Sequence, residues 1–173
     1  MSKDKNVDEL HVLHPLITES RWLFGPEYDT AEYTSNRQLQ TVVKSLFNGK
    51  IKEGHGVNLQ KRPDLVVLSD DSTVSITGTE DFSKETDLVV INKVLIIELK
   101  RGGFEIKREE RNQAQNYIED LMALGVNAPS YNAFVVGDSV STTLQRHSYV
   151  GDNKEGSIYV TTFSQLVDTA EKR

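Results

Sequence analysis

The chain has 173 residues, of which 37% are hydrophobic and 27% are charged, and these values fit one globular domain with a core of its own. The chain has no cysteine, which excludes disulfides, thiolate zinc sites and a cysteine nucleophile. The net charge of −6 argues against a protein that coats nucleic acid, because affinity for phosphate comes largely from Lys and Arg.

Two helices are expected in the first part of the chain. We expect residues 1–6 to be a disordered lead, and residues 7–173 to form a single domain. Apolar residues recur at helical spacing over 8–20 and again over 30–48. The N-terminus lacks the apolar stretch of a secretory signal, and no run nears the ~18 apolar residues of a membrane span. We therefore expect a cytoplasmic protein without membrane contact.

The middle of the chain is rich in Val and Ile and predicts a sheet. The expected strands are 62–69, 73–77, 87–91, 93–100, 131–136 and 157–162. The polar stretch 78–86 is expected to be a loop, and Asn92 a tight turn. Helices are expected over 105–124, ended by Gly125, and after Ser164 as N-cap. This order predicts an α/β fold with a mixed central sheet flanked by helices.

The strand over 94–100 ends in charged residues. Its first four positions are all apolar, as in a strand covered on both faces. Side chains alternate along a strand, so Glu98 and Lys100 share one face while Leu99 points to the other. Burying such a pair costs several kcal/mol unless partners compensate. The pair is therefore either a functional site or the point where the strand emerges into solvent.

Two further patterns accompany this pair. Pro63-Asp64 opens an apolar run, where a proline is tolerated at the start of a strand. Gln113 and Tyr117 are four residues apart in the helix after the pair, and so share one helical face. In this order, these residues resemble the PD-(D/E)XK nuclease superfamily. Within it the chain looks most like Shedu-type anti-phage defence nuclease domains, also through residues 19–29 and 94–104.

The resemblance implies a restriction-endonuclease-like fold and a metal-dependent endonuclease that hydrolyses DNA phosphodiester bonds. Mg²⁺, or Mn²⁺, would be held by Asp64, Glu98 and the backbone carbonyl of Leu99. Lys100 would orient the attacking water and stabilise the transition state. Gln113 and Tyr117 would position these groups. The resemblance also implies a sensor or ATPase portion, and self-association to cut both strands.

Several assignments have alternatives. Asp87 lies closer in sequence to Glu98 than Asp64 does, and is a rival for the first metal carboxylate. Many relatives add a glutamate from the first core helix, for which Glu19 is a candidate. Three basic residues beside the helix start could contact DNA or form a solvated face: Lys107, Arg108 and Arg111.

The main alternative function is a catalytically silent nuclease-fold module that binds nucleic acid or a partner protein. A third candidate function is a pure interaction domain, in which the charged pair only marks the point where a strand emerges into solvent.

Overall fold

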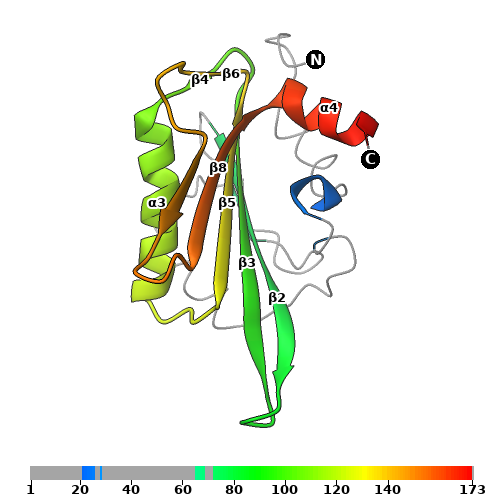
Figure 1. Cartoon of the computed structure of the whole chain (residues 1–173), viewed down its shortest axis with the longest axis vertical. Coiled ribbons are helices and arrows are strands. Elements are labelled where there is room, and N and C mark those ends of the chain that lie inside the picture. The colour runs from blue at the N-terminus through cyan, green and yellow to red at the C-terminus, as the bar shows by residue number, and fades with distance from the viewer. Residues whose placement is uncertain (1–20, 26–27, 29–64, 69–71, 173) are drawn as a thin grey trace.

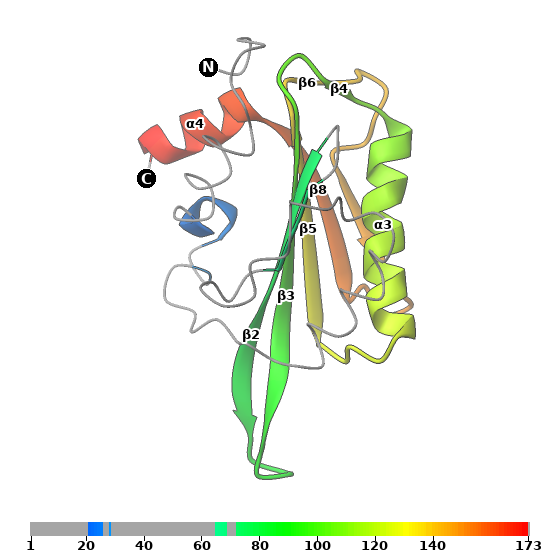
Figure 2. The same ribbon diagram turned by 180° about the vertical axis from the view of Figure 1, so that it is seen from behind.

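The computed structural model describes residues 21–25, 28, 65–68 and 72–172, and these form an α/β arrangement around one long mixed sheet (Figure 1). Helix α3 (Arg108–Ala123) covers one face of the sheet, and α4 (Phe163–Lys172) lies on the other face with the short 3-10 helix η2 (Arg21–Phe24) (Figures 1 and 2). The predicted α/β fold with a mixed sheet flanked by helices is confirmed. The helices expected over 8–20 and 30–48 lie outside the described residues.

The main sheet has six strands in the order β1-β2-β3-β5-β8-β7. Their bounds are β1 Leu65–Leu68, β2 Ser72–Ser83, β3 Leu88–Lys100, β5 Ser130–Gly137, β8 Gly156–Thr162 and β7 His147–Val150. The first three strands form an antiparallel meander, β3, β5 and β8 are parallel, and β7 pairs antiparallel with β8. Two short strands, β4 (Glu105–Ile106) and β6 (Ser139–Val140), form a separate parallel pair.

Strands β2 and β3 are longer than the sequence pattern predicted. Residues 78–83, expected to belong to a loop, continue β2, and the turn comes only at 84–87. The turn expected at Asn92 is wrong, because β3 runs through it without a break. The pairing with β2 passes from Lys93 to Ile91, so Asn92 is the extra residue of a β-bulge. The hairpin extends beyond the rest of the sheet as a two-stranded arm (Figure 1).

Strand β3 separates two apolar cores because its side chains alternate between the faces of the sheet. Val94 and Ile96 belong to the core beneath α3, while Leu95 and Ile97 belong to the core beneath α4 and η2. All four are buried, as the uninterrupted apolar run predicted. The α3 core is closed by the apolar stripe of the helix, namely Ala114, Tyr117, Ile118 and Leu121.

Helix α3 connects the parallel strands β3 and β5. It begins later than expected, because Ile106 is a buried residue of β4 and not part of the helix. It ends as predicted at Gly125, whose φ of +91° suits glycine. The N–H groups of Gly125 and Val126 donate to the carbonyls of Met122 and Leu121, the two bonds of a Schellman motif. This end fixes where the chain turns toward β5.

Helix α4 begins one residue after Thr162, not at the Ser164 N-cap that we expected. The backbone N–H of Gln165 donates to Thr162 Oγ1 at 3.2 Å, and the N–H of Thr162 donates to Gln165 Oε1 at 3.2 Å. This reciprocal pair is a capping box, in which glutamine serves as the third helical residue. Within the described part of the chain, no helix is both long and apolar enough to cross a membrane.

Candidate active site

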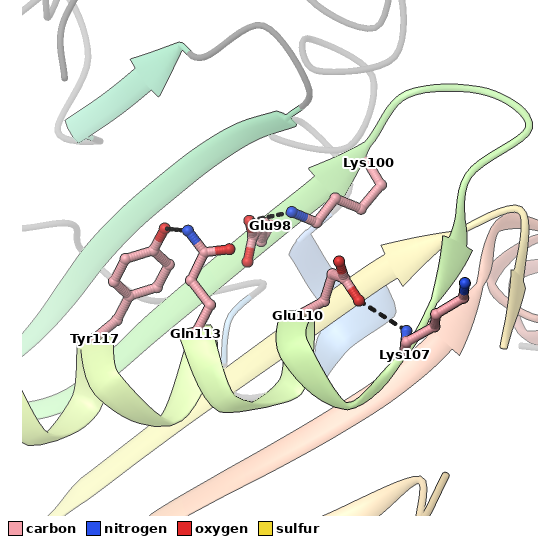
Figure 3. Close-up of polar contacts among 6 residues, drawn as sticks. All are labelled: Glu98, Lys100, Lys107, Glu110, Gln113 and Tyr117. Carbon is pink, nitrogen blue, oxygen red and sulfur yellow. Dashed lines mark hydrogen bonds and ion pairs between the residues drawn. The ribbon is translucent and has the colours of Figure 1, made fainter. Parts of the chain in front are cut away.

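The charged pair lies at the carboxyl end of β3, on the face that α3 covers (Figure 3). Lys100 Nζ donates to Glu98 Oε1 at 2.7 Å. Glu98 is 1% exposed and Lys100 4% exposed, so both charges are removed from water. The expectation that strand alternation puts the two side chains on one face is confirmed. The alternative that the strand simply emerges into solvent at this point is wrong for these two side chains.

The neighbouring strands explain this burial. Glu98 is flanked by Val74 of β2 and Val135 of β5, both buried in the α3 core. Leu99, between the two charged residues, turns its side chain into the opposite core. The pair thus stands in the middle of the sheet, where a carboxylate and an ammonium compensate each other's loss of hydration.

The second carboxylate oxygen of Glu98 accepts no hydrogen bond from Lys100. Glu98 Oε2 is buried and has no hydrogen-bond partner among the described residues. Buried carboxylate oxygens are almost always paired, and leaving one unpaired is costly. A ligand that carries a positive charge or donates a hydrogen bond would satisfy this oxygen.

Gln113 and Tyr117 lie on the face of α3 that looks toward Glu98 (Figure 3). Gln113 Nε2 donates to the Tyr117 hydroxyl at 2.7 Å. The pKa of Tyr117 is raised well above its usual range, mainly by burial and further by the negative charge of Glu98, while the bond from Gln113 opposes the shift. Tyr117 is therefore a neutral phenol that keeps its proton. The prediction that these two residues share one helical face is confirmed, and their role at the pair stays a prediction.

Glu110 lies on the same helical face, one turn before Gln113, and sequence reasoning missed it. Its Oε2 accepts the backbone N–H of Lys107 at 2.8 Å and so caps the start of α3. In Figure 3 its carboxylate lies on the side of the helix that faces the Glu98–Lys100 pair. The spacing of Glu110, Gln113 and Tyr117, at i, i+3 and i+7, is the signal that could have identified it.

None of the acidic metal ligands that we expected is seen beside Glu98 in the described part of the chain. Asp64 and Glu19 lie outside the described residues. Asp87 is exposed in the turn at the far end of β3, with φ of +51°. At ~3.3 Å per strand residue it lies roughly 30 Å or more from Glu98, which separates it from any cation that Glu98 holds. No group of three or more acidic or histidine side chains suited to a metal ion occurs in the described part of the chain.

The three basic residues expected to contact DNA lie at the start of α3. Lys107 and Arg108 are exposed. Arg111 is half-buried, and one of its terminal nitrogens donates to Asn112 Oδ1 at 3.0 Å. Positive charge at a helix N-terminus opposes the helix dipole, and here Glu109 and Glu110 offset it. Helix stability therefore does not explain why basic residues occupy the end of α3 nearest the charged pair.

Comparison with known proteins yielded no match: no family model fits the chain, and no characterised protein or solved structure is similar enough to count as a relative. The geometry of the site therefore carries the functional argument alone.

A hard divalent cation fits this geometry through one described group. Such cations prefer oxygen ligands, and Glu98 Oε2 is a buried carboxylate oxygen that no group in the described part of the chain satisfies. The ammonium of Lys100, only 2.7 Å from the other oxygen, supplies a fixed positive charge beside it. A buried carboxylate, an ammonium, and a phenol with its amide partner form an arrangement that can bind and stabilise a substrate that gains negative charge.

Proposed function

We propose that this chain is a metal-dependent nuclease of the PD-(D/E)XK type, with a restriction-endonuclease-like fold, that hydrolyses DNA phosphodiester bonds in anti-phage defence. The observation that carries the proposal is the buried Glu98–Lys100 pair, in which Glu98 Oε2 has no hydrogen-bond partner among the described residues. A purely structural ion pair in a core would gain stability from satisfying every oxygen. A buried oxygen without a partner calls for an explanation, and a catalytic role or a bound ion supplies one.

The order of elements supports the same proposal. The pair ends the central strand of a mixed sheet, and the next helix crosses over to a parallel neighbour. That helix presents Gln113 and Tyr117 to the pair, as the resemblance requires. Two parts of the motif, from β3 and from α3, therefore meet on one face of the sheet, although their separation in the sequence does not force them to.

The chemistry follows from the residues present. Glu98, Asp64 and the backbone carbonyl of Leu99 would hold Mg²⁺ or Mn²⁺, which when bound lowers the pKa of water and neutralises charge on the phosphate. Lys100 orients the attacking water and offsets the charge that develops on the phosphate oxygens. Gln113 fixes the Tyr117 hydroxyl at 2.7 Å, and this neutral phenol donates a hydrogen bond without adding negative charge.

The net negative charge of the chain adds to the proposal a means of bringing the domain to DNA. A chain with net charge −6 holds phosphate weakly, even with Lys107 and Arg108 at the site. We therefore include a sensor or ATPase portion, and self-association, as the means by which this domain is brought to DNA.

The experiment compares plasmid and linear DNA cleavage, with Mg²⁺ and with Mn²⁺, by the wild type and two site variants. We expect Glu98→Gln and Lys100→Met each to lower the cleavage rate by about 100-fold or more. Two matched controls carry the same chemical changes at exposed positions on other surfaces: Glu119→Gln and Lys172→Met. Cleavage that persists in both site variants, or that falls equally in the controls, would contradict the mechanism.

One observation favours a second candidate, a catalytically silent module of the same fold that binds nucleic acid or a partner protein. Lys100 Nζ lies 2.7 Å from Glu98 Oε1, the direct contact that a purely structural ion pair makes. If the wild type binds DNA but cuts none of the substrates with either cation, the silent module replaces the nuclease.

A further inference from the structure

The ammonium of Lys100 has a second neighbour besides Glu98. Lys100 Nζ lies 5.5 Å from the centroid of the Phe104 ring. A cation within about 6 Å of an aromatic face is attracted by the negative charge density of the ring. The attraction is stronger where water is excluded, and Lys100 is 4% exposed. Lys100 is therefore held by a carboxylate and by an aromatic ring.

The turn that carries Phe104 is fixed at both of its backbone groups. The N–H of Phe104 donates to the carbonyl of Arg101 at 3.2 Å. The carbonyl of Phe104 accepts from the N–H groups of Asp138 at 3.0 Å and Ser139 at 3.3 Å. Gly103, with φ of +81°, permits the chain to reverse within this turn. The position of the ring is therefore set by the backbone and not by its own side-chain packing alone.

The end of β5 is shaped to receive this turn. A Cβ atom at Gly137 would come within 2.8 Å of Ile106 Cγ1 and 3.1 Å of the Phe104 carbonyl oxygen. Only a glycine at this position allows the turn to approach so closely. Because Gly137 follows the buried strand residues Val135 and Val136, the turn is attached directly to the rigid core of the sheet.

We propose that Phe104 is a positioning residue that holds the Lys100 ammonium at the site through its ring, independently of Glu98. Its ring remains beside Lys100 when the Glu98 carboxylate is engaged by a ligand, and it stops the long lysine side chain from moving into solvent. The effect of Phe104 on DNA cleavage rests on the proposed function, whereas its hold on Lys100 does not.

The first measurement is independent of catalysis. Lysine labelling by reductive methylation of the folded, full chain is followed by mass spectrometry, with the exposed Lys172 as internal reference. We expect Phe104→Leu, which keeps an apolar side chain but removes the ring, to raise Lys100 labelling about two- to thirtyfold. Phe104→Trp keeps an aromatic face and restores the wild-type rate. Phe134→Leu is the matched control, because Phe134 is also a half-buried aromatic but lies on the opposite face of the sheet.

The second measurement is the cleavage rate of the same variants. We expect Phe104→Leu to lower kcat with KM nearly unchanged, and Phe104→Trp to recover it. If Lys100 labelling rises in Phe104→Leu but even the wild type cuts no DNA, the hold on Lys100 stands and the nuclease proposal fails. If labelling of Lys100 stays at the wild-type rate in Phe104→Leu, or rises as much in Phe134→Leu, the inference about Phe104 is overturned.

Discussion

Removing the charge of Lys100 should expose how much the fold depends on the buried pair. Lys100→Met keeps most of the apolar stem of the side chain and removes the ammonium. It leaves Glu98, 1% exposed, as a buried charge without its countercharge. Removing one partner of a buried ion pair costs about 3–5 kcal/mol, because the remaining charge is neither hydrated nor compensated. We expect a loss of that size in the free energy of unfolding.

The double variant separates this cost from the loss of packing. In Glu98→Gln/Lys100→Met neither charge is left, so most of the penalty disappears. We expect the double variant to be more stable than Lys100→Met alone, with a coupling free energy of about 2–3 kcal/mol between the two positions. For a chain of 173 residues, a loss of 3–5 kcal/mol lowers the melting temperature by about 6–20 °C.

Urea denaturation followed by circular dichroism gives the free energy of unfolding for the wild type, both single variants and the double variant. Lys172→Met, at an exposed position of α4, serves as the control and should stay within about 0.5 kcal/mol of the wild type. The reasoning is refuted if Lys100→Met loses less than about 1 kcal/mol, or if the effects of the two single changes simply add. Either result would mean that Glu98 and Lys100 are hydrated in solution.

Two more predictions concern the ligands and the phenol of the site. Asp64→Asn should weaken Mg²⁺ or Mn²⁺ binding, measured by calorimetry, by about tenfold or more. Asp87→Asn should leave binding unchanged, because Asp87 lies at the other end of β3, and the reverse pattern would contradict a metal site at Glu98. Tyr117 has a folded pKa raised above the unfolded value of 10.0, so its contribution to stability is complete below pH 10 and is lost as pH rises further. Between pH 9 and 11 the wild type should therefore lose stability faster than Tyr117→Phe, by at most about 1.4 kcal/mol per pH unit, and parallel curves would contradict the burial of this phenol.

Features that depend on a short stretch of chain could be predicted from the sequence. The uninterrupted apolar run 94–97 predicted a strand covered on both faces, and all four side chains are buried. Gly125 predicted the end of α3, because few other residues adopt the positive φ that it has there. The contact between Glu98 and Lys100, and that between Gln113 and Tyr117, follow from the periods of strand and helix.

Features that depend on pairing between distant segments could not be predicted. Residues 78–83 form a strand because β3 supplies backbone partners along their whole length, and Asn92 is accommodated as a bulge. Ser164 is not the N-cap because Thr162, two residues earlier, forms the capping box with Gln165. Strand β7 was missed because its four residues, His147–Val150, have little apolar alternation, and it forms only along β8.

The same division holds for the candidate site. The contact of Phe104 with Lys100 could not be predicted, since Phe104 belongs to a turn whose place is set by hydrogen bonds from Asp138 and Ser139. Glu110 carried a signal in its helical spacing but resembles an ordinary N-terminal acid. The roles of Asp64 and Glu19 stay predictions, because both lie outside the described residues.

The crossover from β3 through α3 to β5 has a consequence for the order of folding. The β2–β3 hairpin joins strands that are neighbours in the chain, whereas the parallel β3–β5 pairing requires the crossover through α3. We therefore expect the hairpin to form first, with Glu98 and Lys100 hydrated until α3 covers them. The free-energy cost of dehydrating the pair then falls on the docking of α3. We expect this cost to lower the rate of the late step of folding.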